Sequence, residues 1–263
     1  MAVAMEKTYT SNIIHAGALV ADTRLLLAAW NTQESVPENL QRVVDENLLA
    51  KSSRARLKEE LVVFKKRYLL DAELTAALVT LVQANIAGKT LHAILYYLTA
   101  EADPLIADSV TELFAAMLAE GKHDITTKAM TAWLLAAVRT GRTAGQWSAS
   151  TAERIAHGVL ATLRDFDIIA GKAKKRLQQP FLPVPAFAFI AFLLQREGQT
   201  GERLLTHPSW RRFLLNRREV EQHFLAAHQE NVLNYQAAGR VVRIEFPVNT
   251  IKEYARVLVE RAL

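Results

Sequence analysis

Four cationic side chains lie within five consecutive residues of the sequence: Lys172, Lys174, Lys175 and Arg176. Lysine and arginine are side chains that commonly contact the phosphate oxygens of a nucleic-acid backbone. The surrounding stretch, FDIIAGKAKKRLQQPFLPVP, is interpreted as a hairpin with a first strand over 167–170, a tip over 171–176 and a return over 177–184. The sequence therefore predicts a basic hairpin tip that suits a polyanionic partner.

The helix expected before this hairpin carries further cations on one face. At 100° per residue, an apolar face collects Ile155, Val159, Leu163 and Phe166. The opposite face collects Arg154, His157, Ala161 and Arg164, with Gly158 beside it. Long cations bind phosphates and small residues allow backbones to approach, so this face is typical of a helix that enters a DNA groove.

Helix, helix and basic hairpin follow one another in the order of a winged helix-turn-helix, with 127–140 as the positioning helix. The loop 141–149 between the two helices is longer than the three or four residues usual for this motif. An exposed basic loop after an ordinary amphipathic helix would give the same pattern, and that alternative stays open.

A second basic segment, residues 51–70, contains seven basic and two acidic side chains. Helical spacing gives it an apolar face of Leu57, Leu61, Phe64 and Tyr68. One flank carries Lys51, Arg54, Lys58 and Lys65. A helix expected at 35–50 precedes the segment, again in helix-turn-helix order. No basic hairpin follows it, so a solvated helix face explains this segment as well as a DNA contact does.

A third group interleaves aromatic and basic residues around Trp210-Arg-Arg-Phe, with Arg217 and Arg218 after it. Aromatic rings between arginines can stack on nucleobases. However, the spacing of Trp210, Phe213 and Leu214 is typical of a stripe that faces a protein core, and we favour that interpretation.

Enzyme signatures are absent from the sequence. The ten glycines form neither a dinucleotide-binding nor a P-loop pattern, and no H-E-x-x-H or G-x-S-x-G occurs. With no cysteine, thiolate catalysis and iron–sulfur clusters are excluded. The closest histidines, His223 and His228, lie about 140° apart around a helix and would not share a metal. We therefore expect a protein that is not an enzyme and has no catalytic residues, metal or cofactor.

Composition indicates a soluble globular protein. Its 263 residues are 51% hydrophobic and 22% charged, with a net charge of +5. The longest apolar run, 181–194, contains two prolines and is shorter than the roughly 20 residues that span a bilayer. We expect a buried helix there, no membrane association, and a cytoplasmic location.

Helix signals dominate the rest of the chain. Capping-box spacing occurs at Ser35-Val-Pro-Glu38, at Ser109 with Glu112, and at Ser150 with Glu153. Helices are expected at 35–50, 54–70, 71–86, 90–100, 109–119, 127–140, 150–165, 184–196, 209–216, 217–237 and 250–263, and one strand at 240–246. Gly88 is expected to end the third helix.

The fold class is therefore mostly α: a compact multi-helix bundle with helix-turn-helix or winged-helix-like units and a few short β-strands. We divide it into an N-terminal helical part with a helix-turn-helix-like pair (1–100), a second helical part with a winged-helix-like unit (101–200), and C-terminal helices with a short strand (201–263).

Three stretches of the sequence are distinctive: YTSNIIHAGALVADTRLLL near the start, ERLLTHPSWRRFLLNRREVEQHFLAAHQ, and YQAAGRVVRIEFPVNTIKEYARVLVE at the end. Together they resemble the BrxA family of the BREX bacteriophage-exclusion systems, from Tyr9 to the C-terminus. The resemblance implies a cytoplasmic, non-enzymatic, mostly helical protein that binds double-stranded DNA and acts beside other BREX components. Because the visible cations suit phosphates, which carry no direct sequence information, we expect little sequence specificity. It also implies RNA as an alternative ligand, because the family fold is similar to that of antitermination factors. A different class remains open: an assembly scaffold whose basic surfaces bind acidic BREX proteins.

Overall fold

The computed structural model describes residues 8–69, 71–239 and 241–262. Helices dominate, and short strands form two small antiparallel sheets, so the expected mostly-α fold class is confirmed. The described residues fall into two compact units: unit 1 within Met1–Leu19 and Thr99–Pro180, and unit 2 within Val20–Leu98 and Phe181–Leu263. Each unit joins two separate stretches of chain, whereas the division into 1–100, 101–200 and 201–263 uses consecutive segments and stays a prediction.

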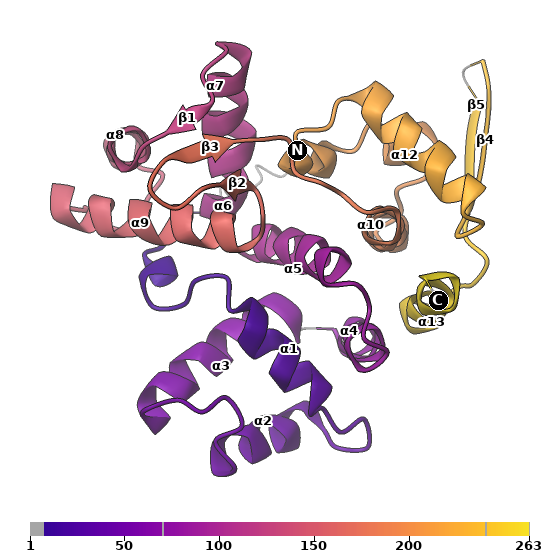
Figure 1. The fold of residues 1–263 in the computed structure, drawn as a ribbon, viewed down its shortest axis with the longest axis horizontal. Helices are drawn as coiled ribbons and strands as arrows, with labels where there is room; N and C mark the ends of the chain where they lie inside the picture. The colour runs from indigo at the N-terminus through magenta and orange to yellow at the C-terminus, as the bar shows by residue number, and fades with distance from the viewer. Residues whose placement is uncertain (1–7, 70, 240, 263) are drawn as a thin grey trace. The chain divides into compact units, whose positions relative to one another are not determined.

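Unit 1 combines helices with a three-stranded sheet (Figure 1). Its elements are η1 (Asn12–Ile14), α6 (Pro104–Asp108), the π-helical η2 (Ser109–Phe114), α7 (Ala115–Ala119), β1 (Asp124–Ile125), α8 (Thr127–Arg139), α9 (Ala149–Asp165), β2 (Ile169–Ala170) and β3 (Lys175–Leu177). The sheet has the order β1-β3-β2 and is antiparallel throughout. Helices α8 and α9 pack against each other, and α9 also contacts β2.

Unit 2 is a helical assembly with one hairpin. Its elements are α1 (Val20–Ala28), α2 (Val36–Asp45), α3 (Arg54–Tyr68), α4 (Ala72–Gln83), most of α5 (Gly88–Ala102), α10 (Val184–Arg196), α11 (Glu202–Leu205), η3 (Pro208–Phe213), α12 (Arg217–Gln229), β4 (Asn234–Ala238), β5 (Val241–Glu245) and α13 (Ile251–Ala262). Helices α4 and α13, far apart in sequence, pack side by side.

Side-chain caps fix several of the helix starts. Ser35 and Glu38 form the expected capping box at the start of α2, and Ser53 caps α3. The expected caps at Ser109 and Ser150 are wrong. Ser109 lies inside a continuous helical stretch and donates to the carbonyl of Leu105, while a serine two residues before Ser150 caps α9.

Other element limits differ from the sequence-based expectation. The helix from 35 ends at Asp45 rather than at 50. Gly88 opens α5 instead of ending α4, and Asn85, with φ 56°, supplies the left-handed residue after α4. The helix from 217 ends at Gln229, and residues 234–238 form β4, which pairs with the expected strand at 241–245. Residue 240 lies outside the described residues.

The first described residues of unit 1, 8–19, form an arm that packs against α8 and α9. The buried Tyr9 hydroxyl donates to Asp108 at 2.8 Å, and the Arg142 guanidinium lies 4.9 Å from the Tyr9 ring centroid. The Arg142 side chain also pairs with Asp108 at 2.9 Å and with Glu112 at 2.7 Å. The backbone of Tyr9 is hydrogen-bonded to residues 142 and 144. These contacts fix the loop that leads into α9.

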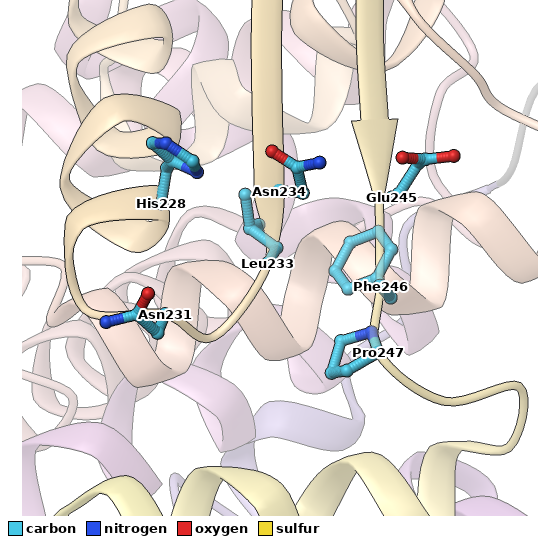
Figure 2. A pocket seen from close by; sticks show the side chains of 7 residues that line it. All are labelled: His228, Asn231, Leu233, Asn234, Glu245, Phe246 and Pro247. Atoms are coloured by element: carbon cyan, nitrogen blue, oxygen red, sulfur yellow. The ribbon is translucent and has the colours of Figure 1, made fainter.

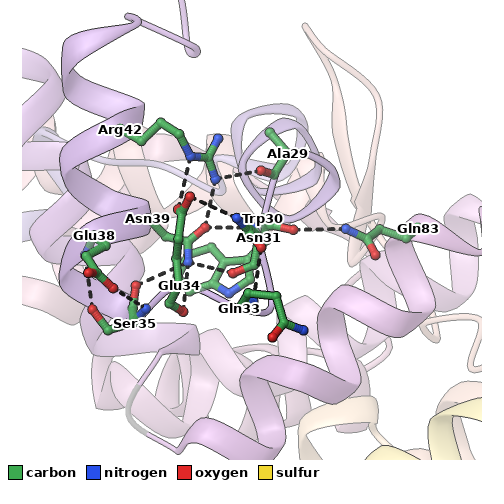
Figure 3. A network of polar contacts seen from close by, with 10 residues as sticks. All are labelled: Ala29, Trp30, Asn31, Gln33, Glu34, Ser35, Glu38, Asn39, Arg42 and Gln83. Atoms are coloured by element: carbon green, nitrogen blue, oxygen red, sulfur yellow. Dashed lines mark hydrogen bonds and ion pairs between the residues drawn. The ribbon is translucent and has the colours of Figure 1, made fainter.

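A polar network fixes the turn between α1 and α2 in unit 2 (Figure 3). The buried Asn39 donates to the carbonyl oxygen of Asn31 at 2.9 Å and accepts from the Asn31 amide at 2.8 Å. Arg42 donates to the carbonyl oxygen of Ala29 at 2.9 Å and pairs with Glu34 at 3.1 Å. The network thereby holds α2 at the end of α1 and places the chain for α3.

Residues 184–194 of the apolar run lie in α10, the core helix of unit 2. Phe187, Phe189, Ile190 and Leu194 are each fully buried, and Phe192 is 2% exposed. This confirms the expected buried helix. Among the described residues, no helix has both the length and the apolarity needed to cross a membrane.

Trp210 and Phe213 also belong to this core. Both are buried, and the Trp210 indole N–H donates to the carbonyl oxygen of Leu204 at 2.8 Å. The core interpretation of these two residues is confirmed, and neither ring is available as a stacking platform. Leu214, half-buried with φ 57°, ends η3.

Candidate nucleic-acid interface

The hairpin β2–β3 lies in unit 1 next to the end of α9. Ile169 pairs with Leu177 and Ala170 with Arg176. Gly171, at φ +83°, makes the turn, and a Cβ there would lie 2.0 Å from the carbonyl oxygen of Lys174. Only glycine fits such a turn. The hairpin is thus tightly closed at its tip.

The basic tip is shorter than expected, because β3 begins at Lys175. Residues 171–174 form the turn, and Lys172 and Lys174 are exposed within it. Lys175 and Arg176 lie on the strand itself, half-buried and exposed respectively. Successive strand residues point to opposite faces of a sheet, so these two cations leave β3 in different directions.

The two faces of α9 are as expected. Ile155, Val159, Leu163 and the adjoining Phe166 are buried. Arg154 and His157 are exposed, and Ala161 and Arg164 are half-buried. The helix rises about 1.5 Å per residue, so the row from Arg154 to Arg164 extends over roughly 15 Å. A basic row of this length therefore lies on the open side of α9.

Gly158 serves a different purpose from the one expected. A Cβ at this position would lie 3.1 Å from the carbonyl oxygen of Ile13. The backbone that approaches Gly158 is therefore that of η1, in the arm at the start of unit 1. The glycine allows protein packing and is not free for a groove contact.

Carboxylates lie beside two of the cations. Arg164 pairs with Asp165 at 2.9 Å, and Arg176 lies 3.8 Å from Asp124 of β1. The Arg176–Asp124 pair is largely solvent-exposed and the Arg164–Asp165 pair is partly exposed, and surface pairs of this kind are weak. A phosphate can compete with them, so they reduce the cationic character of the surface without removing it.

The second basic segment lies in unit 2 as α3. Its expected apolar face, Leu57, Leu61, Phe64 and Tyr68, is buried. Arg54, Lys58 and Lys65 are exposed on the other side of the helix.

Lys51 does not belong to this exposed set. Its ammonium lies 2.9 Å from Asp22 and 3.0 Å from the buried Glu60. Partial burial works against the charge, but the hydrogen bonds to both carboxylates outweigh it, and the pKa of Lys51 is raised. The lysine neutralises a buried acid and is not available to a phosphate.

The site residues therefore fall into two groups. Arg154, His157, Arg164, Lys172, Lys174, Lys175 and Arg176 share unit 1, and Arg54, Lys58 and Lys65 share unit 2. Sequence reasoning missed strand β1, whose pairing with β3 completes the sheet. It also missed Lys128, exposed in the first turn of α8. Strand β1 could not be found from the sequence, because two residues are too few to show an alternation of apolar and polar side chains. Lys128 could have been found, since it lies two residues after Thr126, the cap of α8.

The fold and these surfaces define a mostly α-helical protein with exposed basic surfaces on two units. Among the described residues, no cluster of potential metal ligands is found. The chain belongs to the BrxA family, whose family model matches residues 7–193. Membership associates it with the BREX phage-exclusion systems, and the resemblance seen in the sequence is confirmed over residues 7–193. The resemblance of the two later stretches, which lie beyond residue 193, stays a prediction.

The fold is also similar to the crystal structure of an uncharacterized protein from Magnetospirillum magneticum. The TM-score is 0.57 at 15% sequence identity, over 73% of this chain and 94% of that chain. At this identity the likeness shows the fold alone. No functionally curated protein matches the chain.

Proposed function

We propose that the chain is a non-enzymatic, duplex DNA-binding component of a BREX system in the cytoplasm, and that α9 and the hairpin β2–β3 of unit 1 are its main contact surface. The observation that carries this proposal is the element order α7, β1, α8, α9, β2, β3 with the sheet order β1-β3-β2. A helix-turn-helix whose second helix is followed by a hairpin is the arrangement of a winged helix.

The exposed charges agree with that arrangement. The major groove of B-DNA is about 12 Å wide and admits an α-helix. A row of roughly 15 Å on α9 corresponds to about four base pairs at 3.4 Å each. Cations at the hairpin, Lys172 and Lys174 first among them, would contact the backbone beside the groove.

We also propose that binding depends little on sequence. Six of the seven candidate site residues of unit 1 are lysines or arginines, which suit phosphates. Phosphate contacts fix position and orientation but carry no direct sequence information. Unrelated duplexes should therefore bind within about tenfold of one another. A preference above about 10³ for one sequence would identify a specific regulator instead.

The test replaces Lys172, Lys174 and Lys175 together with glutamine, which removes charge but keeps chain length. Each phosphate contact contributes about 0.9 to the slope of log affinity against log salt. The variant should lose up to about 2.7 of that slope, measured by fluorescence anisotropy on a random duplex between 50 and 300 mM salt. Circular dichroism should be unchanged, because these side chains are not in the core.

The matched control is the triple glutamine variant at Arg54, Lys58 and Lys65 on α3. We expect a smaller loss, since among the described residues α3 is followed by helix α4 and not by a hairpin. If only this control loses affinity, unit 2 is the DNA-binding unit. If neither variant changes binding, the basic surfaces are solvated and an assembly role with other BREX proteins replaces the proposal. Tighter binding of an RNA of equal length would make RNA the ligand.

A further inference from the structure

Unit 2 contains a small-molecule-sized cavity between the end of α12 and the hairpin β4–β5 (Figure 2). Its volume is about 300 Å³, and it is lined by His228, Asn231, Leu233, Asn234, Glu245, Phe246 and Pro247. Three lining residues are apolar: the buried Leu233, the half-buried Phe246 and the exposed Pro247. The other four side chains are polar, and we call them the polar rim. An apolar concave site with a few polar groups of fixed position is the usual form of a small-ligand site.

The polar rim is built on a fixed register. Asn234 and Glu245 are direct cross-strand partners, so their side chains leave the same face of the hairpin. Residues opposite one another in antiparallel strands have Cβ atoms roughly 4.5–5.5 Å apart. Figure 2 shows the amide and the carboxylate at the same level on the two strands, with His228 opposite them on α12.

These groups are available to a ligand. In the described part of the chain, the Asn234 side-chain amide makes no hydrogen bond. Glu245 uses one carboxylate oxygen to pair with Arg243 at 2.6 Å, and both side chains are largely exposed. The Tyr235 amide donates to Nδ1 of His228 at 3.4 Å, which leaves the proton on Nε2, where it can be donated. The rim thus offers an acceptor carboxylate, an amide and an imidazole donor.

Guanine has the complementary edge. Its N1–H and N2–H₂ donate in one direction, toward a carboxylate, and its O6 beside them accepts from an amide NH₂. Adenine has an unprotonated N1 at the same position. This nitrogen and a carboxylate oxygen are both acceptors, so no hydrogen bond would form between them. The ring of Phe246, packed edge-to-face against Phe192 at 5.0 Å and Tyr254 at 5.1 Å, is held in place as apolar support for a base.

We propose that this cavity binds a guanine base, either of a free guanine nucleotide or of an unpaired guanosine in single-stranded nucleic acid. Carboxylate Glu245 receives the N1 and N2 protons, amide Asn234 donates to O6, and Phe246 supports the ring. The site is in unit 2 and shares no residue with the α9–hairpin surface. Guanine binding at this site can therefore be tested independently of duplex binding by unit 1.

The test titrates the full chain with guanosine monophosphate and adenosine monophosphate in an isothermal calorimeter. Guanosine monophosphate should bind at least about tenfold more tightly, because a site built to hydrogen-bond one edge rejects an analogue that leaves its groups unpaired. Glu245→Gln replaces an acceptor oxygen with an NH₂ group and should remove that preference. Asn234→Ala should weaken guanine binding about tenfold or more.

Gln236→Ala is the matched control, since Gln236 is an exposed amide on the same hairpin face and lies outside the cavity. It should bind as the unchanged chain does. The glutamine triple variant on the β2–β3 hairpin should also keep guanine binding, which separates this site from the proposed function.

Oligonucleotides distinguish the two sources of the base. A single-stranded thymidine decamer with one central guanosine is compared with the all-thymidine decamer and with guanosine monophosphate. Preference for the guanosine decamer supports an unpaired base as ligand, and binding of the mononucleotide alone supports a free nucleotide. Equal binding of the two mononucleotides, no binding of any probe at millimolar concentration, or an unchanged preference in Glu245→Gln would each overturn the proposal.

Discussion

Replacing Phe187 with alanine tests the core of unit 2 at its centre. The ring is fully buried and stacks between Trp210 at 4.5 Å and His223 at 4.9 Å, with Phe224 edge-on at 4.7 Å. Truncation of a buried phenylalanine typically lowers the free energy of unfolding by about 3–5 kcal/mol, through lost transfer energy and the cavity left behind. We expect about 4 kcal/mol, because three aromatic neighbours lose a partner and cannot all collapse inward.

The assay is urea denaturation, followed by circular dichroism and by tryptophan fluorescence. The midpoint of the unit 2 transition should fall while the dependence on urea stays constant, as expected when the exposed surface is unchanged. Phe181→Ala is the matched control. Its ring is 69% exposed and lies 5.9 Å from the Lys89 ammonium, so its loss should be no more than about 1 kcal/mol. A loss below about 1.5 kcal/mol for Phe187→Ala would refute the packing argument.

Three further predictions concern single residues. Gly171→Ala should weaken duplex binding in the anisotropy assay, because the added Cβ would lie 2.0 Å from a backbone oxygen of the hairpin tip. Gly145→Ala is the control and should bind normally, because a Cβ at that position has nothing within 4 Å. Burial lowers the pKa of His223, so as the pH falls the unfolded chain takes up this proton before the folded chain does. The stability that the neutral imidazole contributes to unit 2 should be fully present above about pH 6.5 and should be lost progressively below that value. His223→Phe should reduce this pH dependence in urea titrations at about pH 7.5 and 5.5. Lys51→Met removes the ammonium partner of Glu60 and leaves Arg56, at 3.3 Å, as its remaining cation. Stability should fall by no more than the lower part of the roughly 3–5 kcal/mol range for a broken buried pair, and adding Glu60→Gln should restore most of the loss in thermal melts.

Local signals in the sequence were reliable where one physical cause dominated. The run Val184–Arg196 is apolar on all sides and begins after a proline, and it forms a helix with those limits. Ser35 and Glu38 satisfy each other's backbone amides, so their spacing alone located the start of α2. The final helix likewise starts after Thr250, whose hydroxyl accepts from the Glu253 amide.

Elements that depend on distant partners could not be predicted in this way. Strand β4 has helix-forming alanines, and only its pairing with β5, through the turn at Gly239 with φ +60°, makes it a strand. Ser109 has a capping pattern, but Asp103 caps the helical stretch six residues earlier. Local patterns compete with such tertiary contacts and lose.

The candidate site shows the same limit. Helical periodicity correctly identified the exposed and buried faces of α9 and α3. It could not show that Lys51 is paired with the buried Glu60 and with Asp22, because Asp22 lies on another helix, α1, 29 residues earlier in the chain. Nor could it show that Gly158 packs on the arm at Ile13. Charge type can be read from sequence, but the availability of a charge depends on the fold.

The interleaved connectivity of the two units has a consequence for biosynthesis. Helix α4, with the buried Leu78, Val79, Leu81 and Val82, packs on α13, which is translated roughly 180 residues later. At about 5–20 residues per second, α4 leaves the ribosome roughly 10–35 s before its partner exists. During that interval α4 lacks its α13 partner, so we expect its apolar face to bind chaperones. A nascent chain arrested before residue 251 should be markedly more sensitive to proteolysis in unit 2 than the released protein.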